Sequence, residues 1–292
     1  MSKVILLVGP TAVGKTKISI DLAKYYNADI INADSTGIYK EPVIGTAKIT
    51  EKEMDGVKHH MLNLISLKED YTIYDYQKEG RAVLEKLINE NKNVIITGGS
   101  GLYIKALLYN YNLEETTIKR IDYSEYTNEE LKSMADEIDI NNNIHVNNRQ
   151  RLERYITYYK ETGNTIKKKD DINLPLYDFI SIGLKTDRET LYDRCNKRVD
   201  IMFNDGLLKE AKELYKLNTK NFSNLIGYKE LEMYFKKLIT LEEAKELIKQ
   251  NTRHYAKRQF TWFNNQMKDI KWFDVDYNNI ENTIDKIKEY LN

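Results

Sequence analysis

An eight-residue loop, GPTAVGKT at residues 9–16, separates an apolar segment from a segment with helical periodicity. Residues 3–8 (KVILLV) predict a buried strand, and apolar side chains in residues 17–26 recur at the spacing of a helix. Glycines in such a loop let backbone N–H groups converge on phosphate oxygens, and the helix start adds a favourable partial charge. Strand, loop and helix in this order match the phosphate-loop pattern. The sequence therefore predicts a phosphate-binding site.

Two side chains of the loop indicate the chemistry that accompanies the phosphate. Lys15 is suited to neutralise phosphate charge, and the Thr16 hydroxyl is suited to ligate Mg²⁺. We therefore predict Mg²⁺ as the cofactor, with Thr16 as the metal-binding residue. The predicted phosphate site comprises Gly9, Pro10, Thr11, Ala12, Val13, Gly14, Lys15 and Thr16.

Further apolar runs alternate with helical patterns along the chain. An amphipathic helix is predicted at residues 74–91, with Thr72 as its cap. Strands are predicted at residues 29–32, 61–65, 93–97, 177–186 and 270–275. This alternation indicates an α/β fold. We predict a parallel sheet of the phosphate-loop NTPase type, flanked by helices, with a small helical insertion.

The insertion is predicted at residues 112–143, where the strand–helix alternation stops. This segment is polar and acidic, with nine Asp or Glu residues against Lys119, Arg120 and Lys132. We expect it to have little core of its own. Residues 1–111 and 144–292 would then form the phosphate-loop catalytic core.

The composition of the whole chain narrows the class of protein. The 292 residues carry a formal net charge of zero, so a nucleic-acid partner has to be sought in local patches. The single cysteine, Cys195, excludes an internal disulfide framework and a cysteine-based zinc finger. No apolar run approaches the length of a membrane span. We expect a cytoplasmic monomer with no membrane partner.

The phosphate loop by itself does not imply ATP. A nucleotide triphosphatase also has a Walker-B strand, in which apolar residues end in a metal-binding Asp. Here residues 93–97 lead into glycines, and Asp34 follows a different strand. This disfavours a motor ATPase or GTPase and leaves a small-molecule kinase open.

From residue 31 onward the chain resembles the tRNA dimethylallyltransferase family in its bacterial form. Matching segments include INADS at 31–35, IGTAK at 44–48, HHML at 59–62, GGSGLY at 98–103, GYKE at 227–230 and AKRQFTWF at 256–263. Residues 39–40, 74–75, 147–151, 194–202 and 206–207 match as well. Together these segments cover nearly the whole chain outside the predicted insertion.

The resemblance implies transfer of a dimethylallyl group from dimethylallyl diphosphate to the N6 amine of adenosine 37. This base lies beside the anticodon of tRNAs that read codons starting with U, and the products are i6A and diphosphate. The amine loses a proton as it bonds, so a carboxylate is needed near it. Asp34 has this role in the family, Ser100 resembles the hydroxyl that assists it, and Arg198 binds the diphosphate. The residues expected at the tRNA are Asp34, Ser35, Thr36, Gly37, Ser100, Arg149, Arg151, Gly227, Tyr228, Lys229, Lys257 and Arg258.

Two stretches combine basic and aromatic side chains. Residues 145–169 contain Arg149, Arg151 and the run Lys167-Lys168-Lys169, and residues 249–271 contain Lys257 and Arg258. Basic groups contact phosphates and aromatic rings stack on unpaired bases, so both stretches suit the anticodon stem-loop of tRNA. The alternative for either stretch is a solvated helix face backed by core aromatics.

Other interpretations of the site residues stay open from sequence alone. Asp34 could be a helix cap, or an outer ligand that reaches Mg²⁺ through water. Arg194 and Arg198 lie four residues apart and could pair with Asp193 and Asp200 on a solvated helix face. The chain could also prenylate free adenine nucleotides, or bind RNA without catalysing a reaction.

The chain departs from the family pattern at three of these positions. Gly37 stands where the family usually has Gln, which removes a side chain able to contact the target adenine. Asn148 stands where Asp is common, and Ser100 replaces the more frequent Thr but keeps the hydroxyl.

Overall fold

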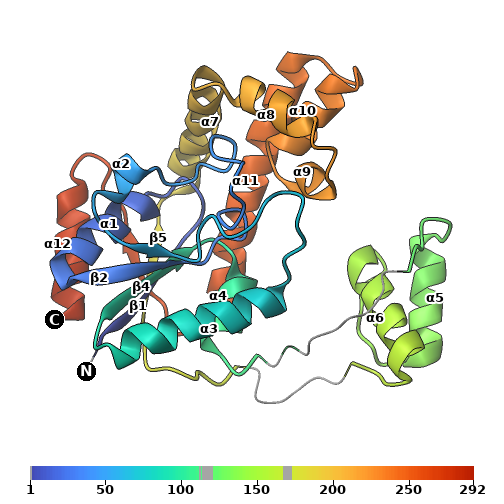
Figure 1. The fold of residues 1–292 in the computed structure, drawn as a ribbon, viewed down its shortest axis with the longest axis horizontal. Helices are drawn as coiled ribbons and strands as arrows, with labels where there is room; N and C mark the ends of the chain where they lie inside the picture. The colour runs from blue at the N-terminus through green and yellow to red at the C-terminus, as the bar shows by residue number, and fades with distance from the viewer. Residues whose placement is uncertain (1, 112, 114–120, 167–172) are drawn as a thin grey trace. The chain divides into compact units, whose positions relative to one another are not determined.

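The structure is a computed structural model that describes residues 2–111, 113, 121–166 and 173–292. The chain divides into two compact units: Met1–Tyr111 together with Leu174–Asn292, and Asn112–Asn173 (Figure 1). Several basic residues noted above, namely Lys119, Arg120 and 167–169, lie outside the described residues, as does Asn112. No described helix is both long enough and apolar enough to cross a membrane.

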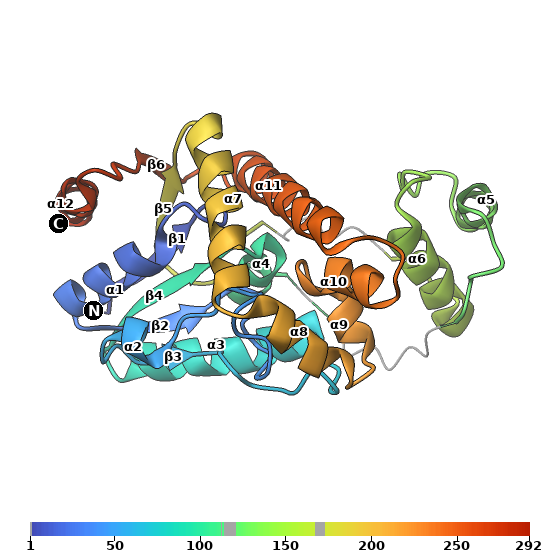
Figure 2. The same cartoon turned by 90° about the horizontal axis from the view of Figure 1, so that it is seen from above.

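The large unit is built on a six-stranded sheet with the order β3-β2-β4-β1-β5-β6 (Figures 1 and 2). Every pair of neighbouring strands is parallel. The strands are β1 Val4–Val8, β2 Ala28–Asn32, β3 His59–His60, β4 Asn93–Gly98, β5 Ile180–Lys185 and β6 Lys271–Asp274. This confirms the predicted α/β fold with a parallel sheet.

Helices cover both faces of the sheet, and accordingly β1 is apolar at every position and β4 at residues 94–96. On one face, Ile5 and Leu7 pack with residues of α1 and α12, and on the other Leu6 and Val8 pack with residues of α3 and α4. The helices of this unit are α1 Lys15–Tyr26, α2 Glu51–Met54, α3 Ile73–Asn89, α4 Gly101–Leu108, α7 Arg188–Asn204, α8 Leu207–Tyr215, α9 Lys220–Asn224, α10 Tyr228–Phe235, α11 Leu241–Gln266 and α12 Ile280–Leu291.

Helix α3 begins where its sequence predicts. The Thr72 hydroxyl accepts a hydrogen bond from the Asp75 backbone N–H (3.2 Å), and the Asp75 carboxylate accepts one from the Thr72 N–H (2.8 Å). This reciprocal capping box satisfies two backbone donors at the helix start. The predicted helix at residues 74–91 is therefore confirmed with slightly shifted ends.

The predicted strand at residues 61–65 is wrong. The strand at this edge, β3, is limited to His59–His60. Met61 and Asn63 have φ angles of 58° and 55°, in the left-handed region, so the extended backbone cannot continue through them. Apolar composition alone did not indicate this turn.

The small unit contains α5 Asn128–Ile138 and α6 Arg149–Thr162 and has its own apolar core. The insertion was expected to end at residue 143 with little core, but the compact unit continues to Asn173. The reason is that α6 packs against α5. The core is formed by Tyr123, Leu131, Ala135, Ile144, Leu152, Tyr155 and Ile156.

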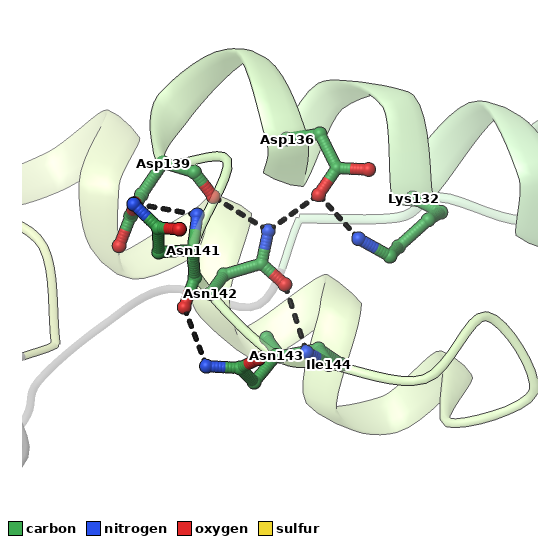
Figure 3. A network of polar contacts seen from close by, with 7 residues as sticks. All are labelled: Lys132, Asp136, Asp139, Asn141, Asn142, Asn143 and Ile144. Atoms are coloured by element: carbon green, nitrogen blue, oxygen red, sulfur yellow. Dashed lines mark hydrogen bonds and ion pairs between the residues drawn. The ribbon is translucent and has the colours of Figure 1, made fainter.

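Polar side chains fix the turn between α5 and α6 (Figure 3). The Asn142 amide donates to Asp136 Oδ1 and to the Asp139 carbonyl, both at 2.7 Å, and its Oδ1 accepts from the Ile144 N–H (2.8 Å). Lys132 pairs with the same Asp136 carboxylate. The Asn-rich end of the expected insertion is thus a connection held by side-chain hydrogen bonds to the backbone.

Candidate active site

The phosphate loop has the backbone conformation that its glycines permit. Gly9 and Gly14 have φ angles of 152° and 106°, and Gly14 precedes the first residue of α1. A Cβ atom on Gly9 would lie 2.6 Å from the carbonyl oxygen of Leu184 in β5, so no side chain fits there. The close approach of β5 and the turn into α1 explain why glycine is needed at both positions.

Lys15 lies across the loop, held by two carbonyl groups. Its Nζ donates hydrogen bonds to the carbonyl oxygens of Gly9 and Pro10, both at 2.8 Å. Burial lowers the pKa of the Lys15 ammonium to about 8, while the nearby Asp34 carboxylate acts in the opposite direction and Arg198 lowers the pKa further. An anion bound in the loop would relieve this desolvation penalty, since it stabilises the charged ammonium.

Two arginines of α7 point to the phosphate loop. Arg198 Nη1 donates to the Thr11 hydroxyl (3.0 Å), and Arg194 Nε donates to the Ala12 carbonyl (2.8 Å). The Arg194 guanidinium also lies over the Tyr277 ring, 3.8 Å from its centroid. The alternative of pairing with Asp193 and Asp200 is wrong for these arginines. Those carboxylates pair with lysines instead, at 2.7 Å in each case: Lys197 and Lys245.

Asp34 follows β2 and is fixed by its neighbours. Its Oδ1 accepts hydrogen bonds from the Thr36 N–H (3.1 Å) and hydroxyl (2.9 Å), and the Asn32 carboxamide accepts from its N–H and donates to its carbonyl. Asp34 Oδ2 accepts no hydrogen bond from a described residue and lies beside Gly99. A turn follows Asp34, not a helix, so the cap interpretation is wrong.

Ser100, at the start of α4, connects the loops that follow β2 and β4. Its Oγ accepts a hydrogen bond from the Ser35 N–H (2.9 Å) and contacts the Ser35 hydroxyl at 3.1 Å. The Ser100 N–H donates to the Ala33 carbonyl (3.1 Å). The predicted neighbourhood of Ser100 and the Asp34 loop is therefore present in the fold.

Two residues of α11 lie at the site although neither was predicted as a site residue: Gln259 in the matched segment 256–263, and Tyr255 in the basic stretch 249–271. Gln259 is buried, accepts a hydrogen bond from the Thr11 N–H (2.7 Å) and donates to the Gly99 carbonyl (3.0 Å). Burial raises the pKa of the Tyr255 phenol, the Asp34 carboxylate raises it further, and hydrogen bonding with Ser100 opposes both effects. The available signal was the four-residue spacing of Tyr255 and Gln259, which puts both on one helix face.

A cavity of about 520 Å³ lies between the phosphate loop, Asp34 and Arg198. Cationic side chains and hydroxyls of the phosphate loop lie at one part of its wall, and the Asp34 carboxylate lies at another. Its lining includes Thr11, Lys15, Thr16, Asp34, Thr36, Gly37, Thr97 and Arg198. Such a cavity can hold an anionic group and bring a proton acceptor to a neighbouring atom.

The backbone at Gly37 leaves no room for a larger residue. A Cβ atom there would lie 2.9 Å from Nδ2 of Asn32 and 3.1 Å from Cδ1 of Leu62. The Asn32 amide is held in place by the Asp34 and Met61 carbonyls, both at 3.0 Å. Glycine at position 37 is therefore explained by the space that the Asn32 carboxamide occupies.

Tyr228 is completely buried, so its side chain is not available for the tRNA contact expected of it. The Tyr228 hydroxyl donates to the Glu210 carboxylate, which also accepts from the Ile44 and Gly45 N–H groups. Gly227, which precedes it, is buried as well. This segment supports the loop around residues 44–48. Lys229 is partly exposed, and its contact with tRNA stays a prediction.

The remaining predicted RNA-binding residues differ in their contacts. Lys257 and Arg258 are exposed on α11 and form no ion pair with a described residue. Arg151 is exposed on α6 in the small unit. Arg149, by contrast, donates to the carbonyls of Tyr123 and Tyr126 and pairs with Glu153. The guanidinium of Arg149 is used within its own unit, so direct RNA binding by this residue is not supported.

The fold and the site together define a phosphate-loop protein whose anion cavity ends at a carboxylate from the neighbouring strand loop. A family model described as IPP transferase matches residues 37–266. The chain belongs to this family, which confirms the resemblance found in the sequence.

Curated relatives and solved structures agree with this assignment. The tRNA dimethylallyltransferases of Bacillus subtilis and Fusobacterium nucleatum are each 43% identical to this chain, covering 93% and 94% of the chain and 90% and 93% of those proteins. The crystal structure of tRNA isopentenylpyrophosphate transferase from Bacillus halodurans matches with a TM-score of 0.76 at 36% identity, over 100% of this chain and 96% of that one. A eukaryotic dimethylallyltransferase acting on tRNA matches with a TM-score of 0.83 at 27% identity, over 99% of this chain and 78% of that one.

Proposed function

We propose that the protein transfers a dimethylallyl group from dimethylallyl diphosphate to the N6 amine of adenosine 37 in tRNAs that read U-starting codons. The products are i6A and diphosphate. The observation that carries this proposal is that one cavity joins the phosphate loop to the Asp34 carboxylate. Family membership supplies the prenyl donor and the tRNA acceptor. We further propose that the protein acts as a cytoplasmic monomer.

The diphosphate end of the cavity is assigned to the phosphate loop. Lys15 and Arg198 are within reach of an anion bound there, because both side chains bond to loop groups of residues 9–11. The Thr16 hydroxyl lines the cavity beside the loop and is a hard oxygen donor of the kind that Mg²⁺ prefers, so this residue fits the ion. When bound, Mg²⁺ would neutralise charge on the leaving diphosphate.

The amine end of the cavity is assigned to Asp34 and Ser100. As the N6 nitrogen bonds to the allylic carbon, the C–O bond to diphosphate breaks and one amine proton must leave. Asp34 Oδ2 takes this proton, since Oδ1 is already engaged by Thr36. Ser100 bonds to Ser35 and so positions the loop that carries Asp34. This places the Ser100 hydroxyl near the proposed position of the N6 amine. General-base assistance of this kind contributes about 10²–10⁴ in rate.

The tRNA is proposed to approach over the exposed face of α11. Lys257 and Arg258 lie there, next to Gln259, which accepts a hydrogen bond from the Thr11 N–H of the phosphate loop. Basic groups at this position would contact phosphates of the anticodon loop while the adenine enters the cavity. Ser35, Thr36, Gly37, Arg151 and Lys229 complete the proposed RNA-binding residues.

The Asp34→Asn variant tests the proposal. It keeps the size and most hydrogen bonds of the side chain but removes the proton acceptor, so single-turnover transfer to tRNA should fall by about 10²–10⁴. Binding of tRNA and of the diphosphate should change little. Weaker diphosphate binding that excess Mg²⁺ rescues would instead assign Asp34 to the metal.

Two controls complete this experiment. The Asp193→Asn variant removes a carboxylate that pairs with Lys197 on the surface of α7, and its transfer rate should match the wild type. AMP offered in place of tRNA should not be prenylated. An Asp34→Asn rate within a few-fold of wild type, or efficient transfer to AMP, would contradict the proposal.

A further inference from the structure

Strand β4 occupies the place in the sheet where a Walker-B strand is expected. It pairs with β1, the strand that leads into the phosphate loop, and Thr97 is in register with Leu7. In nucleotide triphosphatases an Asp at the end of such an apolar strand helps to hold Mg²⁺. Here the apolar residues 94–96 end in Thr97, so a neutral hydroxyl stands where a carboxylate is found in those enzymes.

The side chain of Thr97 faces the cavity. Alternation along β4 puts Thr97 on the same face as Ile95, which packs with residues of α1. Thr97 lines the cavity together with Lys15, Thr16 and Asp34. Thr97 is thus a polar residue at the end of β4 in the wall of the cavity that also contains the phosphate loop.

The Thr97 hydroxyl is buried and has no hydrogen-bond partner among the described residues. Buried hydroxyls are normally paired, because removing them from water without a partner is unfavourable. A valine would have nearly the same shape without this penalty. The buried Thr283 of this unit follows the rule, because its hydroxyl accepts from the Asp276 N–H at 2.9 Å.

We propose that the Thr97 hydroxyl is a diphosphate-binding group that donates a hydrogen bond to an oxygen of the Mg²⁺–diphosphate complex. This inference rests on the proposed function, which assigns the cavity to diphosphate. A hydroxyl at this position can donate to a phosphate oxygen, whereas a carboxylate cannot.

Calorimetric titration of inorganic diphosphate in the presence of Mg²⁺ tests the assignment without relying on catalysis. Thr97→Val should bind diphosphate about tenfold more weakly than the wild type, since a hydrogen bond to a charged group is removed. Thr97→Ser, which keeps the hydroxyl, should bind within about twofold of the wild type. The Thr283→Val variant should leave diphosphate binding unchanged.

Thermal unfolding of the ligand-free variants gives a second readout. Thr97→Val should unfold at the same temperature as the wild type or higher, because it removes an unpaired hydroxyl. Thr283→Val should unfold at a lower temperature, because the Asp276 N–H loses its acceptor. Equal diphosphate binding by Thr97→Val and the wild type would overturn the assignment of Thr97 alone. A wild type that does not bind Mg²⁺ and diphosphate at all would overturn the proposed function as well.

Discussion

Helices α6 and α11 both combine basic and aromatic side chains, but their basic groups have different contacts. In α6, Arg149 bonds to two carbonyls of the preceding segment and to Glu153, so it holds the small unit together. In α11, Lys257 and Arg258 extend into solvent, while Gln259 on the opposite face bonds to the phosphate loop. The difference is that α11 connects a solvent-exposed basic face directly to the active site.

Basic composition does not by itself identify an RNA-binding helix. Arginine has five donors and readily bonds to backbone carbonyls of a neighbouring segment. A basic residue is available for phosphate only when the fold gives it no such partner. On this criterion Lys257 and Arg258 remain RNA-binding candidates, whereas Arg149 does not.

The largest effect should come from the inner face of α11. Gln259→Leu removes the partner of the Thr11 N–H and of the Gly99 carbonyl, so the phosphate loop loses its link to the loop after β4. We expect prenyl transfer to fall by about 10²-fold, since small misplacements of reacting groups have effects of this size. Unfolding free energy should fall by about 1–3 kcal/mol.

The matched control for this variant lies on the other helix. Gln150→Leu changes an exposed glutamine of α6 and should alter neither the transfer rate nor the stability. Transfer at the wild-type rate by Gln259→Leu would mean that α11 does not position the active site.

The second effect concerns the outer face of α11. Reversing the charge with Lys257→Glu and Arg258→Glu should weaken tRNA binding. The slope of log affinity against log salt concentration should fall by about 1 for each RNA phosphate that the variant no longer binds. The control Lys86→Glu with Lys286→Glu makes the same change in net charge at exposed sites on α3 and α12. An unchanged salt slope in the α11 variant would assign its charges to solubility alone.

A third prediction separates diphosphate binding from tRNA binding by pH. Because burial lowers the pKa of Lys15 to about 8, this residue loses its proton in the free protein as the pH rises above that value. Diphosphate affinity should then decrease by up to about tenfold per pH unit, since the neutral amine does not attract the anion. Lys15→Arg stays charged over this range. Dividing the diphosphate affinity of the wild type by that of Lys15→Arg removes the effect of the titration of diphosphate itself, because this effect is the same for both proteins. A constant ratio between about pH 7 and about pH 9.5 would contradict the prediction, because this range spans the titration of Lys15.

Local sequence patterns predicted much of this molecule. The phosphate loop, the Thr72 cap and the neighbourhood of Asp34 and Ser100 follow from short segments at the ends of strands. Contacts between distant segments did not follow. Gln259 bonds to Thr11 across 248 positions, and only the packing of α11 against the sheet brings them together. Tyr228 is part of a matched motif, but its burial depends on Glu210 and on the folded loop at Gly45.

The smallest effects should come from α6, and here two neighbouring arginines should behave in opposite ways. Arg149→Ala removes one donor from each of the carbonyls of Tyr123 and Tyr126, although the Tyr123 carbonyl keeps its bond from the Tyr126 N–H (3.0 Å). Because the Arg149 side chain is 35% exposed, water replaces part of what is removed. We expect the opening free energy of α6, measured by amide hydrogen exchange, to fall by about 1 kcal/mol. Arg151→Ala removes an exposed side chain and should leave this exchange unchanged, while the salt slope of tRNA binding falls by about 1 if the residue contacts a phosphate. A decrease of the salt slope in Arg149→Ala without faster exchange in α6 would show that Arg149 also binds RNA, and the contrast between α6 and α11 would then fail.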